Sequence, residues 1–249
     1  MEINMSLNEL EFKSELERVF KLNGLEKYIS EKTTERFFRL TERMLEENEK
    51  YNLTAIVDPK KIILLHYADC VSMADAIPDG ARIIDVGCGA GFPSLPLAIV
   101  REDVSIYAID STAKRINYVN ETADMLGLTN IKAEAMRAED GARSADKREC
   151  FDVATARAVA NMRVLSEITL PFVKVGGELV AMKGRTAEDE LKESSNAIKV
   201  LGAKSQGITL ITLTDGEEIV THPLVRVKKV SRTPTQYPRA YSQISKKPL

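Results

Sequence analysis

The sequence predicts an α/β protein whose sheet is mostly parallel and doubly wound. Short runs rich in β-forming residues alternate with helical stretches between residues 81 and 201, which is typical of a parallel sheet with helices on both faces. After residue 201 two strand-like runs follow without a helix between them, so the sheet is expected to end in antiparallel strands. Residues 1–80 show only helical periodicity. We therefore predict an N-terminal helical cap over 1–80 and an α/β domain over 81–249.

Helices account for the whole of the predicted cap. Apolar residues recur at helical spacing as far as Asn23-Gly24, a pair that commonly ends a helix. A second helix is expected over Thr33–Glu49. Asp58-Pro59 combines an N-cap residue with proline at the first helical position, so it is expected to open a third helix that extends to about Ala76. Apolar side chains of the first two helices are expected in the core, namely Leu10, Phe20, Phe38 and Leu45.

The α/β domain divides into strands and helices of ordinary length. The runs expected to form parallel strands are Ala81–Val86, Val104–Asp110, Asn130–Met136, Phe151–Ala156 and Gly177–Lys183. The expected helices are Pro93–Arg101, Thr112–Leu126, Asn161–Val173 and Ala187–Leu201. The last two strands, Ile208–Leu213 and Leu224–Ser231, flank Asp215-Gly216, a pair typical of hairpin turns.

Composition excludes several classes of protein. The chain has 249 residues, of which 44% are apolar and 29% charged, and this usage excludes disordered and collagen-like chains. No apolar stretch approaches the ~20 residues of a membrane span, and the N-terminus lacks the apolar region of a signal peptide, so we expect a cytoplasmic protein. Three cysteines without a C-x-x-C spacing and only two histidines argue against a disulfide framework and a metal site. A monomer is the default expectation.

A glycine-rich loop follows the first predicted strand and carries most of the functional information. Its glycines, Gly87, Gly89 and Gly91, follow a G-x-G-x-G pattern, and Phe92 stands where a dinucleotide fingerprint would have its third glycine. Asp85 precedes Gly87 by two residues, and its carboxylate would repel a pyrophosphate but favour a cationic ligand. S-adenosylmethionine carries a sulfonium and an ammonium group and no phosphate. The loop therefore favours S-adenosylmethionine over NAD.

Two further strand ends offer cofactor contacts. Asp110 ends the second strand, where its carboxylate is expected to accept both ribose hydroxyls of an adenosine; the alternative is an N-cap for the following helix, a role that Ser111 also suits. Ala138 and Glu139 follow the third strand, beside the expected position of the adenine. In isolation, this pair is more typical of an ordinary helix start.

Basic residues follow the fourth and fifth strands. Arg157 ends a buried strand and is expected to hold the cofactor or the acceptor; the alternative is a structural ion pair. Lys183 and Arg185 lie at the same rim, where exposed loop cations are the alternative. Residues 219–249 contain no acidic residue, which suggests contact with a polyanion, although a solvated edge strand and tail would show the same charge. The candidate phosphate-binding residues are Lys183, Arg185, Arg226, Lys228, Lys229, Arg232 and Arg239.

Several segments together resemble a known family, the bacterial 16S rRNA guanine-N7 methyltransferases (RsmG or GidB). The segments that carry the resemblance are Tyr51–Ile56, His66–Cys70, Asp85–Pro93, Ala156–Ala160, Tyr237–Arg239 and Lys247–Leu249. The resemblance implies a Rossmann-like class I methyltransferase fold. It also implies that S-adenosylmethionine contacts Gly87, Phe92, Ala138, Glu139 and Arg157.

By the same resemblance, the methyl acceptor is N7 of the guanine at position 527, in the 530 loop of 16S rRNA, presented as rRNA or as the 30S subunit. Guanine N7 carries no proton, so direct in-line displacement requires no general base, and no residue is assigned as catalytic beyond the candidates Arg157 and Lys183. Two other hypotheses remain open. One is a methyltransferase for a small molecule or a protein, and the other is a non-catalytic binder of RNA or of ribosome-assembly intermediates.

Overall fold

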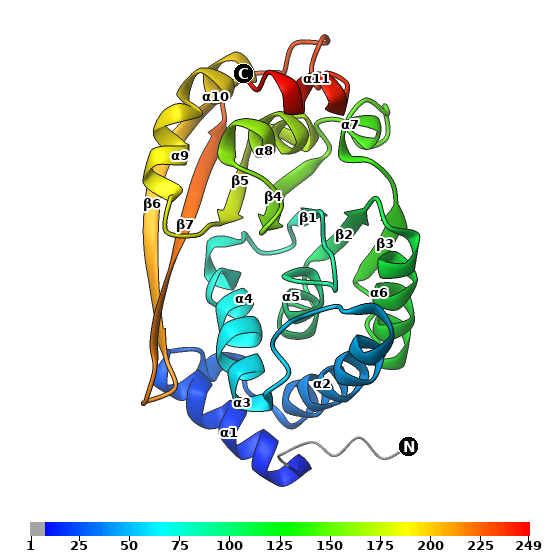
Figure 1. Ribbon diagram of the computed structural model, residues 1–249, viewed down its shortest axis with the longest axis vertical. Coiled ribbons are helices and arrows are strands. Elements are labelled where there is room, and N and C mark those ends of the chain that lie inside the picture. The colour runs from blue at the N-terminus through cyan, green and yellow to red at the C-terminus, as the bar shows by residue number, and fades with distance from the viewer. Residues whose placement is uncertain (1–7) are drawn as a thin grey trace.

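The computed structural model describes residues 8–249, and the elements alternate as the sequence predicts (Figure 1). Helices form the N-terminal part of the chain: α1 (Glu9–Leu22), η1 (Glu26–Tyr28), α2 (Glu31–Tyr51), α3 (Pro59–Ile62), the π-helical η2 (Ile63–Ala68), α4 (Asp69–Ser72) and η3 (Ala74–Ala76). Asp58 caps α3 by accepting hydrogen bonds from the backbone N–H groups of Lys60 and Lys61, as its place before Pro59 predicts.

The remaining elements build one mixed sheet and the helices that cover it. They are β1 (Arg82–Val86), α5 (Ser94–Val100), β2 (Ser105–Asp110), α6 (Ala113–Met125), β3 (Ile131–Ala135), α7 (Ala138–Gly141), β4 (Phe151–Arg157), α8 (Met162–Thr169), η4 (Leu170–Phe172), β5 (Val173–Met182), α9 (Ala187–Glu193), α10 (Ser195–Val200), β6 (Ala203–Thr214), β7 (Ile219–Lys229) and α11 (Tyr241–Lys246).

The strands lie in the order β3-β2-β1-β4-β5-β7-β6. Strands β1 to β5 pair in parallel, whereas β7 is antiparallel to both β5 and β6. This confirms the predicted fold class, including the antiparallel strands at the C-terminal side. In Figure 1 the arrowheads of β1, β4 and β5 lie near the middle of the molecule, between the cap helices below and α8 to α11 above. The carboxyl ends of the parallel strands therefore meet at one edge.

The central strands β1 and β4 are buried on both faces of the sheet, and successive residues of each strand point to opposite faces. Ile83 packs into the cluster that contains Phe37 and Tyr67 of the cap, while its neighbour Ile84 packs into the cluster of α8 and η4 that contains Phe172. The first cluster joins side chains of residues 1–80 to those of the α/β domain without interruption. A division of the chain near residue 80 stays a prediction.

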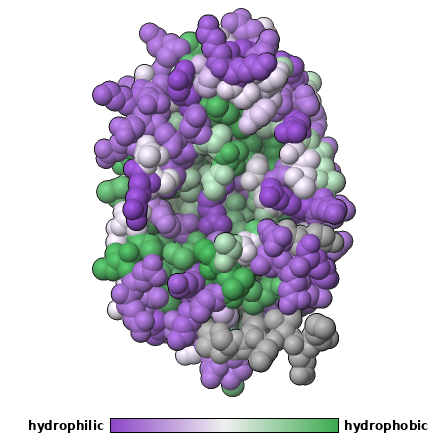
Figure 2. Space-filling view, viewed as in Figure 1, coloured by the Kyte–Doolittle hydropathy of each residue, from purple (hydrophilic) through white to green (hydrophobic). Residues whose placement is uncertain are grey.

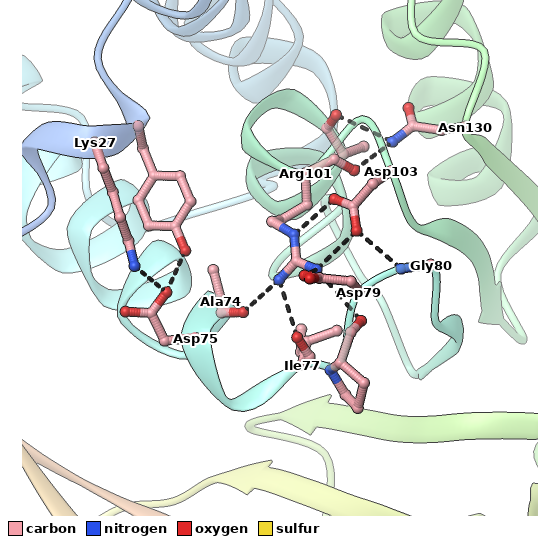
Figure 3. Close-up of polar contacts among 12 residues, drawn as sticks. Lys27, Ala74, Asp75, Ile77, Asp79, Gly80, Arg101, Asp103 and Asn130 are labelled. Atoms are coloured by element: carbon pink, nitrogen blue, oxygen red, sulfur yellow. Dashed lines mark hydrogen bonds and ion pairs between the residues drawn. The ribbon is translucent and has the colours of Figure 1, made fainter.

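Arg101 ties the end of the cap to the sheet (Figure 3). Its guanidinium, at the end of α5, donates hydrogen bonds to the carbonyl oxygens of Ala74 and Ile77 and forms an ion pair with Asp103. Asp103 in turn accepts a hydrogen bond from the backbone N–H of Gly80. The pairing with Arg101 holds the pKa of Asp103 well below its usual range, so the carboxylate stays charged.

Some boundaries differ from the predicted ones. The helix expected to reach Val173 ends at Thr169, because Pro171 cannot continue it, and β5 therefore begins before the Gly176-Gly177 pair. The helix expected over 187–201 divides at the buried Ser194, whose hydroxyl donates to the carbonyl of Leu191. Leu10 was expected in the core but is 81% exposed, since the buried face of α1 consists of Phe12, Leu16, Val19 and Phe20.

Candidate active site

The glycine loop connects β1 to α5 in a conformation that glycine alone accepts easily. Gly87, Gly89 and Gly91 have φ values of 76°, 56° and 84°, in the left-handed region. The N–H of Gly87 donates to the carbonyl oxygen of Ile109, at the end of β2, over 2.8 Å. A Cβ atom on Gly87 would lie 2.8 Å from Cγ2 of Val159, so the loop passes close to the segment after β4.

Asp85 lies beneath this loop, at the end of β1. Its side chain is fully buried, and Oδ2 accepts a hydrogen bond of 3.3 Å from the backbone N–H of Ser94. Oδ1 has no hydrogen-bond partner among residues 8–249, and burial raises the pKa of Asp85 to about 7. Asp85 lines neither of the two cavities described below, and its predicted contact with a cationic ligand stays a prediction. The carboxyl group acts on the loop and on the start of α5.

A cavity of about 250 Å³ opens at the carboxyl ends of β1, β2 and β3. Four predicted cofactor residues line it: Gly87, Asp110, Ala138 and Glu139. The other lining residues are Val86, Ile109, Ser111, Arg115, Met136, Arg137, Ala158, Val159, Ala160, Ile168 and Tyr241. We refer to this space as the first cavity.

Asp110 serves the local backbone and faces the first cavity at the same time. Oδ1 accepts from the N–H of Thr112 over 2.8 Å, and Oδ2 accepts from the N–H of Gly89 over 3.1 Å. Arg115 lies 3.5 Å from Oδ2. Thr112 is the N-cap residue of α6, so the N-cap alternative for Asp110 is wrong, and the carboxylate instead holds the turn before the helix while it faces the first cavity. Glu139 is buried at 8% exposure and makes no hydrogen bond or ion pair within residues 8–249, so its carboxylate is available to a ligand.

A second cavity, of about 380 Å³, lies at the carboxyl ends of β4 and β5. It is lined by Ile56, Leu65, His66, Asp69, Arg157, Ala158, Met182, Lys183, Gly184 and His222. Ala158 lines both cavities, and its φ of 56° is unusual for a residue with a side chain. The two cavities are therefore separated at this point by one strained residue. Figure 2 shows apolar side chains exposed near the middle of the face drawn there, with hydrophilic side chains among them.

Polar side chains form a connected chain along the second cavity. Thr54 Oγ1 lies 3.0 Å from Nε2 of His66, and the guanidinium of Arg157 lies 3.2 Å from Nδ1 of the same ring. Asp69 Oδ2 accepts a hydrogen bond of 3.3 Å from the guanidinium of Arg157. Its other oxygen, Oδ1, lies 2.7 Å from Nδ1 of His222. Arg157 therefore lies beside the second cavity, where it forms the structural ion pair that was its alternative role.

Phe92 supports this chain from the side of the glycine loop. Its ring stacks on His66 with centroids 4.6 Å apart, and the guanidinium of Arg157 lies 5.0 Å from the Phe92 centroid. Phe92 is buried and does not line the first cavity, nor do Gly89 and Gly91. The loop therefore contacts both sites: Gly87 lines the first cavity, and Phe92 packs against His66 and Arg157 of the second.

The pKa values of the two histidines are shifted in opposite directions. Burial, together with the nearby positive charge of Arg157, lowers the pKa of His66 to about 4. The hydrogen bond to Asp69 raises the pKa of His222 above its usual value. His66 is therefore neutral at physiological pH, whereas the protonated form of His222 is favoured by its environment.

The predicted phosphate-binding residues separate into two groups. Lys229 is buried, and its ammonium contacts Glu149 and the carbonyls of Leu170 and Val173; this corrects its assignment as a phosphate contact. Lys183, Arg226 and Arg239 pair with carboxylates of Glu190, Glu178 and Glu167 respectively. The other predicted phosphate-binding residues, Arg185, Lys228 and Arg232, form no ion pair within residues 8–249.

The direction of β7 explains part of this outcome. Because β7 is antiparallel to β5, Lys228 lies opposite Glu178, toward the edge where β5 begins, while Leu224 lies opposite Met182 at the end of β5. The basic end of β7 therefore points away from the two cavities, and Arg185 remains near them. His222, which precedes Leu224, reaches the second cavity. Sequence reasoning missed His222 and Tyr241, although the presence of only two histidines was an available signal.

The described part of the chain contains neither a metal-binding cluster nor a membrane-spanning helix. Within residues 8–249, no cluster of histidine, cysteine and acidic side chains has the arrangement of a metal site. No helix in the same range is long and apolar enough to cross a membrane.

Comparisons with known proteins agree with this architecture. The chain covers 72% of an SAM-dependent O-methyltransferase of Thermotoga maritima, with a TM-score of 0.50, 17% identity and 77% of this chain aligned. It covers 75% of M. jannaschii TYW2 in complex with AdoMet, with a TM-score of 0.52, 16% identity and 65% of this chain aligned. The fold is that of the class I methyltransferases.

A narrower assignment follows from sequence similarity. The family model for rRNA small subunit methyltransferase G (GidB) matches residues 33–220. The ribosomal RNA small subunit methyltransferase G of Clostridium perfringens strain 13 is 49% identical over 215 residues, which are 85% of this chain and 89% of that protein. The chain belongs to the rRNA small subunit methyltransferase G family.

Proposed function

We propose that this protein transfers a methyl group from S-adenosylmethionine to N7 of a guanine in small-subunit (16S) rRNA, at position 527 in the 530 loop. Membership of the rRNA small subunit methyltransferase G family supports the substrate class. The observation that carries the proposal is the first cavity, which lies at the end of β1 beside the left-handed glycine loop and is bordered by two carboxylates, Asp110 and Glu139.

The residues of the first cavity fit S-adenosylmethionine. Gly87 lines the cavity, and because it has no side chain the loop packs directly against Val159, another lining residue. Asp110 retains lone pairs on both carboxylate oxygens for the ribose hydroxyls. Ile109, Met136 and Ile168 supply apolar surface for an adenine ring. When bound, the cofactor would supply an electrophilic methyl group on a sulfonium.

The chemistry requires positioning rather than proton transfer. The lone pair of N7 forms a bond to the methyl carbon while the carbon–sulfur bond breaks, and the electron pair of that bond returns to sulfur. The positive charge passes from the sulfonium to the imidazole ring of the base. No proton moves, so the neutral His66 is not needed as a base, and the contribution of the protein lies in holding the two reactants in line.

The RNA must present N7 outside a regular helix. In A-form RNA, N7 lies in a deep and narrow major groove that side chains do not reach. We therefore expect the acceptor base in an irregular loop or extruded from its stack. Arg185 is exposed and follows Lys183 and Gly184 of the second cavity, so it is placed to contact a phosphate next to that base.

The experiment that tests the proposal uses 30S subunits from a strain that lacks this gene. The protein is incubated with these subunits and S-adenosylmethionine labelled in the methyl group, and the label is located by cleavage at 7-methylguanosine. We expect one labelled guanine in 16S rRNA, and none when subunits from the parent strain are used. Label found only in protein or in small molecules, or no transfer at all, would overturn the proposal.

A further inference from the structure

The second cavity contains several polar groups, but most of them are already engaged by the protein. The Nη1 and Nη2 groups of Arg157 contact Leu65, Asp69 and His66. The ammonium of Lys183 contacts Glu190 and the carbonyl oxygen of Ala160, each over 2.7 Å. These two cations therefore shape the cavity, and neither is free to recognise a ligand without breaking an existing contact.

His222 differs from them because one of its ring nitrogens is uncommitted. Its Nδ1 lies 2.7 Å from Oδ1 of Asp69, and its side chain is 34% exposed. Within residues 8–249 its Nε2 has no hydrogen-bond partner. Because the carboxylate can only accept, Nδ1 carries the proton, and Nε2 is an acceptor in the neutral ring and a donor in the charged ring.

We propose that the second cavity receives the target base and that His222, oriented by Asp69, donates a hydrogen bond from Nε2 to the six-oxo group of guanine. The proposal rests on the proposed function, since it assigns the acceptor side of that same site. Ala158 lines both cavities, so a base in the second cavity borders the space assigned to the methyl donor.

The chemistry of the two purines makes His222 a determinant of specificity. On the edge that contains N7, guanine presents two acceptors, N7 and O6, whereas adenine presents the N7 acceptor beside an amino donor. A donor at Nε2 pairs with O6 of guanine and opposes the amino group of adenine. Arg157 and Lys183 are less suited than His222 to donate a hydrogen bond to O6, because their N–H groups already donate to protein carbonyl oxygens.

The same hydrogen bond makes the reaction depend on pH. The charged and titratable groups around His222 are Asp69 on α4, Arg157 on β4, Lys183 after β5 and His66 on η2. Asp69 raises the pKa of His222, while Arg157 opposes this effect. The donor form is present below that pKa and is lost as the pH rises through it. A general base would show the opposite dependence.

The first test measures the pKa of each histidine ring directly. Histidine ring NMR on labelled protein is simple here because the chain has only two histidines, and the buried His66 is an internal reference. We expect the pKa of His222 to rise further when an RNA hairpin with an unpaired guanine is added in the presence of S-adenosylhomocysteine, and to stay constant with the matched adenine hairpin. An unchanged pKa with bound guanine hairpin would overturn the proposal.

The second test uses substitutions on 30S subunits. His222→Phe should lower kcat/KM by about 10- to 100-fold, the range expected for one hydrogen bond from a charged donor. His222→Gln, whose amide donates at every pH, should keep more activity and lose the decline at high pH. Thr221→Ala, which alters an exposed hydroxyl of the same strand, is the matched control. Circular dichroism and urea unfolding establish that each variant is folded.

The outcomes separate this inference from the proposed function. If wild-type protein methylates the guanine but His222→Gln and His222→Phe behave alike, or the pH profile of His222→Gln equals that of the wild type, His222 is not the donor, and the proposed function stands. If no guanine is methylated by the wild type, both proposals fail.

Discussion

Oδ1 of Asp69 lies 2.7 Å from Nδ1 of His222, although 153 positions separate the two residues in the chain. Asp69 begins α4 in the N-terminal helices, and His222 lies on β7, which the antiparallel hairpin returns to the site. The contact shows that the helical N-terminal segment contributes directly to the wall of the second cavity. It also explains why the histidine is held in one orientation.

Gly87→Ala is expected to lower the affinity for S-adenosylmethionine at least 10-fold. A left-handed backbone costs a residue with a side chain about 1–2 kcal/mol, and the new Cβ would also meet Val159 at 2.8 Å, so the loop must shift. Isothermal titration calorimetry measures the affinity. Gly80→Ala is the matched control, since Gly80 has a φ of 65° with no atom within 4 Å of the added Cβ. Equal affinities in both variants would contradict the role of this loop.

Asp85→Asn should change how stability depends on pH. The pKa of Asp85 is raised to about 7 in the folded protein, so the native state binds its proton more tightly than the unfolded chain does. The free energy of unfolding of the wild type should therefore fall between about pH 4 and 7 relative to Asp85→Asn, by up to about 4 kcal/mol. Urea unfolding of both proteins at pH 5 and pH 8 measures this difference.

Asp103→Asn supplies a control of opposite sign for that experiment. The pKa of Asp103 is lowered by Arg101, so its contribution to stability is present at neutral pH and is lost as the pH falls. The wild type should exceed Asp103→Asn in stability more at neutral pH than at acid pH. A difference between wild type and Asp85→Asn that grows in the same direction would contradict the assignment of a buried, partly protonated carboxyl at Asp85.

Lys229 and Arg185 should respond differently to substitution. Lys229→Met leaves Glu149 without its buried cation and is expected to cost about 3–5 kcal/mol in the free energy of unfolding. Arg185→Gln should leave that free energy nearly unchanged, weaken RNA binding and reduce the slope of log affinity against log salt by about 1. Urea unfolding and RNA binding across a salt series check both. A lowered salt slope in folded Lys229→Met would show that the lysine reaches phosphate.

The order and type of the elements could be predicted from sequence because each signal is local. Alternation of β-rich and helical runs predicts the parallel sheet, and Asp215-Gly216 predicts the hairpin between β6 and β7. The early end of the helix at Thr169 was not predicted, because the apolar residues up to Val173 continue a helical pattern that Pro171 interrupts. The exposure of Leu10 depends on how α1 packs against other elements, which local periodicity does not specify.

Four residues of the first cavity were predicted to lie together, whereas the second cavity was not predicted. Asp110, Ala138 and Glu139 follow strands whose parallel order places their ends together, so their convergence follows from topology alone. The second cavity depends on where the N-terminal helices and β7 approach the sheet, which brings Asp69 and His222 beside Arg157. Basic composition at the C-terminal side favoured Lys229 as an RNA contact, but the antiparallel direction of β7 carries it away from the site.

Asp110→Asn is expected to remove the preference of the site for a ribose. If the carboxylate accepts the 2′-hydroxyl of the cofactor, wild-type protein should bind S-adenosylhomocysteine about 10-fold more tightly than its 2′-deoxy counterpart, and Asp110→Asn should bind the two equally. Comparing two ligands on one variant removes the effect of the lost hydrogen bonds from Gly89 and Thr112, because both ligands meet the same loop. Asp124→Asn, an exposed position on α6, is the control. If Asp110→Asn weakens both ligands by the same factor and keeps the preference for ribose, Asp110 only shapes the loop and does not contact the sugar.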